Sequence, residues 1–255
     1  MIFDILTIFP EMFESPLRAS ILGKASERGL VQIHLRNIRD YAVDKHQMTD
    51  DRPFGGGEGM VMKPEPIAAA LDDLKRSGPA PWVALMSPQG RLFTQETAWK
   101  LSRLPRLVLI CGRYEGVDER IAEHFVDEQL SIGDFVLTGG EMAAMVVVDA
   151  VTRLIPGVLG NQASASIESF TGSLLEYPHY TRPQVFMGHR VPEILLSGNH
   201  LAIEQWRRGM ALVRTRERRP DLFDRLQLSD SDRKLLDQAE RELQRARSDA
   251  LTAAG

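Results

Sequence analysis

The chain has 255 residues, a formal net charge of −4 at pH 7 and a single cysteine. This length suits one large domain, or a medium domain joined to a small one. The charge gives no general attraction to nucleic acid, so any such contact needs a local basic patch. The lone Cys111 excludes an intramolecular disulfide, which suits a reducing compartment.

The first residues do not form a basic start followed by a long apolar core, so we expect no signal peptide. The longest apolar run, residues 142–148, is far too short to cross a bilayer. We therefore expect a cytoplasmic protein without membrane contact.

Short apolar segments alternate with amphipathic segments over the first 154 residues. Strands are predicted at residues 2–9, 31–38, 82–86, 107–111 and 126–131. Helices are predicted from Pro10 to Gly29 and at residues 64–75, 95–104, 117–124 and 139–154. This alternation predicts an α/β fold, a mostly parallel sheet with helices on both faces.

The composition changes after Ile155-Pro156-Gly157. Residues 161–173 are polar, small and glycine-bearing, which is typical of a linker. Beyond them no strand is predicted, and helices are predicted at 201–217 and 233–247, with Pro220 between. We expect an α/β domain over 1–160, a flexible linker over 161–173 and a small helical domain over 174–255.

Two glycine-bearing loops follow predicted strands. CGRYEGVDER begins at Cys111, and SIGDFVLTGGE runs from Ser131 to Glu141. Loops at the carboxyl ends of parallel strands are the usual ligand site of α/β proteins, and glycine lets the backbone approach a ligand. Taken alone, tight packing turns explain them about equally well. Neither loop matches the dinucleotide or the nucleoside triphosphate fingerprint.

A third loop, DDRPFGGGEGM, begins at Asp50. It is either a flexible surface loop or a lid in which Arg52 supplies charge.

Two single residues are further candidates. Arg153 would end the long helix over 139–154, where a cation also suits the helix dipole. Glu168 lies in the expected linker, where a carboxylate is usually solvated but can also be delivered to a substrate as acid or base.

A basic cluster lies in the C-terminal part of the chain. Between residues 201 and 220, six arginines accompany two glutamates, a local charge of +4. They are Arg207, Arg208, Arg214, Arg216, Arg218 and Arg219. A solvated helix face is one interpretation. Arginine beside Trp206 also suits contact with an RNA backbone.

The histidines show no metal-binding spacing, and Cys111 is expected to be a packed thiol.

Several long motifs, taken in chain order, are more specific evidence of function than any single glycine loop. The chain begins IFDILTIFPEMF, and DDRPFGGGEGM, SPQGR, CGRYEGVDER, SIGDFVLTGGE, RLIPGVLG, YPHYTRP and VPEILLSGNH follow. With these motifs the chain resembles, almost end to end, the bacterial tRNA (guanine-N1)-methyltransferases of the SPOUT class, the TrmD family.

This resemblance implies a deep trefoil knot in the α/β domain, a rare exception to unthreaded topology. It implies that S-adenosyl-L-methionine, the methyl donor, binds bent within the knot. The donor contacts would come from Leu85, Met86, Ser87, Pro88, Gly112, Ser131, Ile132, Gly133, Asp134, Phe135, Val136, Leu137, Gly139 and Gly140. It further implies a homodimer whose active sites are shared between subunits, and a need for Mg²⁺, for which no motif here suggests a site.

The implied substrate is tRNA with guanine at position 37 and another guanine before it. The N1 atom of guanine carries a proton, so a base is needed; we assign this role to Glu168. Arg153 would stabilise the charge that spreads to O6, and Glu115 would position the guanine or the donor. The tRNA would be held by Arg52, Arg207, Arg208, Arg214 and Arg216.

The chain departs from the usual family pattern at Glu168, where aspartate is common, at Phe135 for tyrosine and at Ala143 for proline. Two alternatives follow. One is a catalytically silent tRNA-binding homodimer, which the longer side chain of Glu168 would explain. The other is a SPOUT RNA methyltransferase with another target nucleotide.

Overall fold

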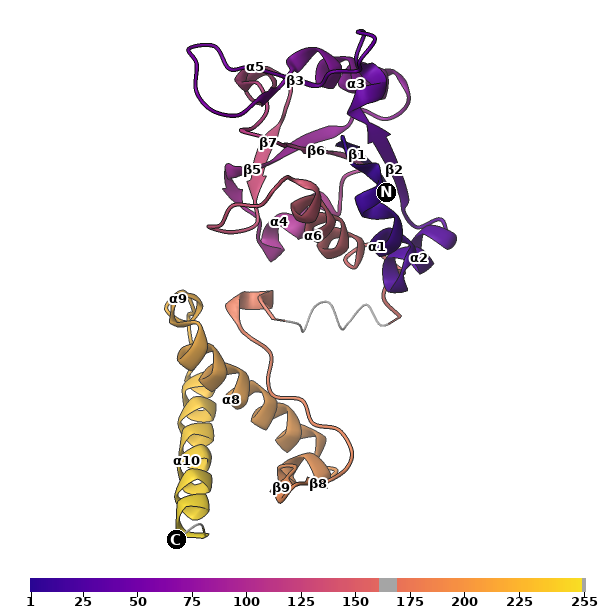
Figure 1. Cartoon of the computed structure of the whole chain (residues 1–255). Coiled ribbons are helices and arrows are strands. Elements are labelled where there is room, and N and C mark those ends of the chain that lie inside the picture. The colour runs from indigo at the N-terminus through magenta and orange to yellow at the C-terminus, as the bar shows by residue number, and fades with distance from the viewer. Residues whose placement is uncertain (161–168, 254–255) are drawn as a thin grey trace. The chain divides into compact units, whose positions relative to one another are not determined.

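The chain forms two compact units, Met1–Ala165 and Ser166–Gly255, in a computed structural model that describes residues 1–160 and 169–253 (Figure 1). Most of the expected linker, including Glu168, lies outside these described residues. Among them, no helix is both long and apolar enough to span a membrane.

The first unit is built on a five-stranded sheet with strand order β2-β1-β6-β5-β7. Its strands are β1 (Ile2–Thr7), β2 (Gln32–Asn37), β5 (Trp82–Leu92), β6 (Arg106–Cys111) and β7 (Glu128–Ser131). Every neighbouring pair is parallel. The predicted mostly parallel α/β sheet is therefore confirmed.

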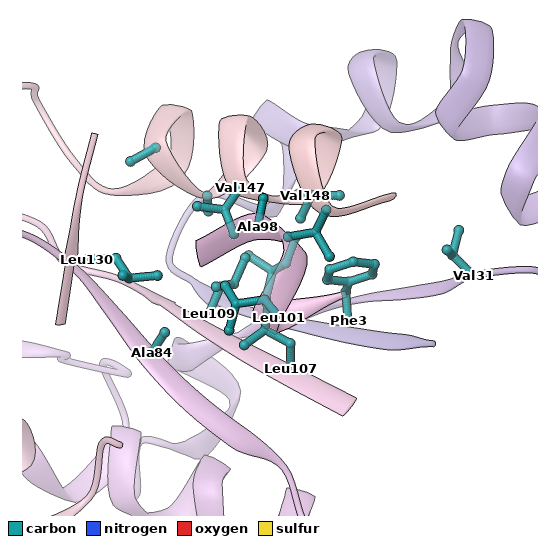
Figure 2. Close-up of a cluster of buried hydrophobic side chains, with 14 of the residues drawn as sticks. Phe3, Val31, Ala84, Ala98, Leu101, Leu107, Leu109, Leu130, Val147 and Val148 are labelled. Atoms are coloured by element: carbon teal, nitrogen blue, oxygen red, sulfur yellow. The ribbon is translucent and has the colours of Figure 1, made fainter. Parts of the chain in front are cut away.

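Helices cover both faces of this sheet (Figure 1). On one side lie α1 (Glu14–Arg18), α2 (Ser20–Glu27), α4 (Gln95–Leu101) and α6 (Glu141–Thr152), and on the other α3 (Pro64–Arg76) and α5 (Glu119–His124). The central strand β6 is buried on both faces, because successive side chains of a strand point to opposite sides. Leu107 and Leu109 pack toward α4 and α6 (Figure 2), while Val108 and Ile110 belong to the cluster that includes α3.

The prediction of one continuous helix from Pro10 to Gly29 is wrong. The segment forms a 3₁₀ turn, η1 (Pro10–Phe13), followed by the separate helices α1 and α2. Ala19 is extended and Ser20 has a φ of 52°, so the helical path breaks between them. The expected stop is confirmed, because α2 ends at Glu27 and Gly29 adopts a φ of 68°.

Two very short strands bracket the glycine loop after Asp50. They are β3 (Asp50–Asp51) and β4 (Val61–Met62), an antiparallel pair that follows the 3₁₀ turn η2 (Ile38–Tyr41). No strand was predicted there, because two residues carry no measurable periodicity. The pairing of β3 with β4 holds the two ends of the glycine loop next to each other.

The second unit is mainly helical. Its elements are η3 (Thr171–Ser173), β8 (Val185–Phe186), β9 (His189–Arg190), η4 (Glu193–Leu196), α8 (His200–Arg218), α9 (Pro220–Phe223) and α10 (Asp230–Ala253). Helices α8 and α10 pack around Leu212 and Leu236. The expectation of no strand after the linker is wrong, since β8 and β9 form a hairpin. Its central residues Met187 and Gly188 have φ angles of 49° and 82°, as a tight hairpin turn requires.

Candidate active site

Three loops meet at the carboxyl edge of the sheet. They are residues 87–90, which bulge out of β5, residues 112–116 after β6, and residues 132–140 after β7. Because parallel strands end at the same edge, these loops enclose one pocket, with a volume of about 320 Å³. This is the size range of small-molecule sites.

The predicted donor residues gather around this pocket. It is lined by Leu85, Met86, Ser87, Pro88, Gly112, Ser131, Ile132, Gly133, Phe135, Val136, Leu137, Gly139 and Gly140. Asp134 is exposed and does not line it. The predicted donor contacts did not include Gln89, Arg113, Tyr114, Gly116, Val117, Glu119, Ala122, Gln129, Leu130, Thr138 and Ala143. Most of these lie beside a predicted residue on the same loop, which was the available signal.

The close approach of the loops requires glycine at position 140. Its N–H donates to the carbonyl of Gly112 at 2.8 Å. A Cβ at this position would lie 2.8 Å from the Cα of Cys111 and 2.9 Å from the Cβ of Met86. Backbone therefore forms this part of the pocket wall, as a donor held by main-chain groups requires.

A buried ionic network joins two of the loops to the sheet. Glu141, at the start of α6, is 1% exposed, and its Oε2 accepts a hydrogen bond from Nε of Arg113 at 2.9 Å. Its Oε1 accepts from the hydroxyl of Thr7 at the end of β1, at 2.8 Å. Arg113 also donates to the carbonyl of Thr138 at 3.2 Å and stacks on Phe9. This network links the loop after β6 and the loop after β7 to the end of β1.

Glu115 lies on the pocket wall and touches the glycine loop from β3 to β4. Its N–H donates to the carbonyl of Met60 at 3.0 Å. Gly59 has a φ of 83°, and a Cβ on it would overlap the carboxylate of Glu115. The C-terminal end of the glycine loop is therefore fixed beside the pocket. Arg52, at its other end, is exposed and does not line the pocket.

Of the three predicted catalytic residues, only Glu115 lines this pocket among the residues that the structure describes. Arg153 caps the C-terminus of α6 and is half-buried, but it does not line the pocket. Glu168 lies outside the described residues.

Cys111 is fully buried at the end of β6. Burial raises the pKa of its thiol well above the ordinary value, and the nearby Glu141 raises it further. The expectation of a packed thiol is confirmed.

Across residues 1–160 and 169–253, no three or more His, Cys, Asp or Glu side chains are grouped so that they could hold a metal ion.

The predicted basic cluster on α8 is partly neutralised by α10. Arg208 pairs with Asp232 at 2.8 Å, and its hydrogen bonds hold the pKa of that carboxyl below the ordinary value. Arg216 pairs with Glu240. Arg214 donates to the carbonyl of residue 176 at 3.4 Å. The charge count over residues 201–220 missed Asp232 and Glu240 because they lie in α10.

Arg207 differs from these cations. It lies over the ring of Tyr177, with its guanidinium carbon 4.9 Å from the ring centroid. The arginines of α8 are thus not equivalent.

The parallel sheet and the pocket at its carboxyl edge define an α/β protein with a cavity of small-molecule size between backbone loops. Comparison with known proteins is more specific. Residues 1–225 match the family model of tRNA (guanine-1)-methyltransferase TrmD.

Curated relatives cover nearly the whole chain. A tRNA (guanine-N(1)-)-methyltransferase of Syntrophotalea carbinolica is 58% identical over 95% of this chain and 98% of its own length. That of Geobacter sulfurreducens is 57% identical over 95% and 99%, and that of Dehalococcoides mccartyi strain BAV1 is 56% identical over 92% and 95%. The chain therefore belongs to the tRNA (guanine-1)-methyltransferase TrmD family.

Proposed function

We propose that the protein is a tRNA (guanine-N1)-methyltransferase that methylates N1 of guanine 37 in tRNAs with guanine at position 36. The observation that carries the proposal is the pocket walled by three glycine-bearing loops in a chain of this family. With tRNA as substrate, the site of action is the cytoplasm.

S-adenosyl-L-methionine fits the character of this pocket. Bare backbone at Gly112 and Gly140 suits close main-chain contact, while Leu85 and Ile132 supply apolar surface. When bound, this donor supplies an electrophilic methyl group on a sulfonium centre. The protein must then hold the acceptor in line with it and remove one proton.

The proton is the difficulty of the reaction. N1 of guanine is protonated, so its lone pair is free to form the new bond only after the proton leaves. We assign Glu168 as the base that takes it, and Arg153 as the cation that stabilises the negative charge spreading to O6. The location of Glu115 on the pocket wall supports a role for it in positioning the guanine or the donor.

The active site is proposed to be completed by a second subunit. Met142 and Val146 lie one turn apart on α6 and are 53% and 46% exposed, and Val136 beside the pocket is 88% exposed. Apolar surface of this kind next to a ligand pocket favours a partner that covers it. A monomeric mass in light scattering at micromolar concentration would refute the shared site.

Mg²⁺ is part of the proposal through the family resemblance. In proteins it usually keeps several waters and is bound by one or two carboxylates together with substrate oxygens. Chelation by EDTA should therefore stop turnover and leave donor binding intact, and added Mg²⁺ should restore it. Turnover that persists in EDTA would remove the metal from the mechanism.

Substitution at Glu168 tests the chemistry. Glu168→Gln should abolish turnover without changing donor affinity in calorimetry, because the base acts on the acceptor; Glu168→Asp should retain turnover. Undiminished turnover by the glutamine variant would refute the assignment. Arg153→Ala should lower the chemical rate, and an effect on tRNA affinity alone would make its role one of binding.

A further inference from the structure

A second hollow lies wholly within the second unit, between the segment that precedes the β8–β9 hairpin and the start of α8. Its volume is about 710 Å³. Tyr177, His179 and Tyr180 contribute aromatic rings to its wall, and Arg182 and Arg207 contribute cations. We call this hollow the aromatic groove.

The rings of the aromatic groove are arranged as stacking surfaces. Tyr177 and His179 have ring centroids 4.6 Å apart at an interplanar angle of 44°. The guanidinium of Arg207 covers the Tyr177 ring. Tyr180 contacts Trp206 at 6.5 Å and is still 49% exposed. Tyr177 is thus packed between two neighbours, whereas about half of the surface of Tyr180 stays exposed.

The remaining lining gives the groove a mixed chemistry. Leu195 and Ile203 form apolar surface, and Gln184 offers an amide. No aspartate or glutamate lines the groove in the part of the chain that the structure describes, although Glu176 lies 3.4 Å from His179 at its margin. Two guanidinium groups without a lining carboxylate stand out in a chain of net charge −4.

A nucleotide combines the features that this groove matches. Its base has two flat apolar faces and a polar edge, and its phosphate is an anion that arginine binds. Proteins that hold single-stranded RNA use the same combination of aromatic platforms and cations. An acidic peptide would engage the cations but would leave the row of rings unused.

We propose that the aromatic groove binds an unpaired nucleotide of the RNA substrate by stacking its base on Tyr180, with the phosphate held by Arg207. The proposal rests on the proposed function, because it takes tRNA as the substrate. It places a nucleotide contact on the second unit.

Tyr180 is the residue to change, because it is exposed and its truncation disturbs little of the fold. In the full-length protein, Tyr180→Leu keeps apolar bulk but removes the ring, Tyr180→Phe keeps the ring, and Phe186→Leu is the matched control. Phe186 is 62% exposed in the same unit but does not line the groove. Fluorescence anisotropy with a labelled, unmodified tRNA transcript measures affinity.

Loss of one stacking contact should weaken binding by Tyr180→Leu about tenfold. Tyr180→Phe and Phe186→Leu should bind as the wild type does. Ultraviolet crosslinking of wild-type protein to the transcript should label the peptide that contains Tyr180. Equal affinity of Tyr180→Leu and wild type would overturn the proposal, as would a Tyr180→Leu variant that changes only the oligomeric mass.

The groove and the proposed function can fail separately. If the wild type methylates tRNA while Tyr180→Leu binds it with full affinity, the groove proposal is wrong and the function stands. If RNA binding depends on Tyr180 but the wild type transfers no methyl group, the groove proposal stands and the function is wrong.

Discussion

Replacement of Glu141 by glutamine tests whether the buried network positions the donor loops. Glu141→Gln keeps the side-chain volume and removes the charge that faces Arg113, which is itself only 15% exposed. The amide oxygen can still accept from Arg113, and the amide N–H can donate to the hydroxyl of Thr7. A hydrogen bond between charged groups contributes about 1.5–3 kcal/mol and a neutral one about 0.5–1.5 kcal/mol. Glu141 accepts two such bonds, and weakening each by about 1 kcal/mol should lower the free energy of unfolding by about 2 kcal/mol.

Urea denaturation measures this loss in the first unit. Trp82 and Trp99 report on that unit once Trp206 is replaced by phenylalanine. With a denaturant slope of about 2 kcal/mol per M, the midpoint should fall by about 1 M. The affinity for S-adenosylmethionine in calorimetry should fall about tenfold, because the contact that ties Arg113 and both loops to Glu141 is weakened. Glu96→Gln is the control, since the ion pair of Glu96 with Lys100 is exposed to solvent.

The two outcomes of this experiment differ clearly. A Glu141→Gln protein with the wild-type urea midpoint and the wild-type donor affinity would refute the idea that the network sets the loops. A lower midpoint with unchanged donor affinity would make the network a contribution to stability alone.

Three further predictions follow from the geometry. Gly140→Ala should weaken donor binding in calorimetry at least tenfold, because its Cβ would meet backbone of the neighbouring loop; unchanged affinity would contradict this contact. Because its pKa is raised, Cys111 should stay unmodified by a thiol reagent even at about pH 8.5 and react only on unfolding; labelling of the folded protein would contradict its burial. Arg207→Gln should weaken tRNA binding in anisotropy more than Arg208→Gln, since Arg208 is already paired with Asp232; equal effects would refute this ranking.

The sequence predicted the features of the fold that depend on local pattern. Apolar runs such as 107–111 identified the strands, and glycines after them identified the loops of the pocket. The strand order β2-β1-β6-β5-β7 could not be predicted in this way, because it depends on crossovers between distant segments. The β8–β9 hairpin was missed because two-residue strands have no periodicity, and the trefoil knot stays a prediction.

The site could be predicted as far as contiguous motifs reach. The link from Glu141 to Thr7 joins residues 134 positions apart, so no local pattern reveals it. The pairs of Arg208 with Asp232 and Arg216 with Glu240 were missed for the same reason, since a charge count within one helix ignores the next. The roles assigned to Glu168 and Arg153 stay predictions.

The central claim is methyl transfer to guanine 37, and one assay tests it most directly. Labelled methyl from S-adenosylmethionine is offered, in the presence of Mg²⁺, to an unmodified tRNA transcript with guanines at positions 36 and 37, and to the same transcript with the position-37 guanine replaced. We expect label on the first transcript and none on the second. No label on either transcript, from protein that binds both donor and tRNA, would contradict the account and indicate a silent tRNA-binding relative.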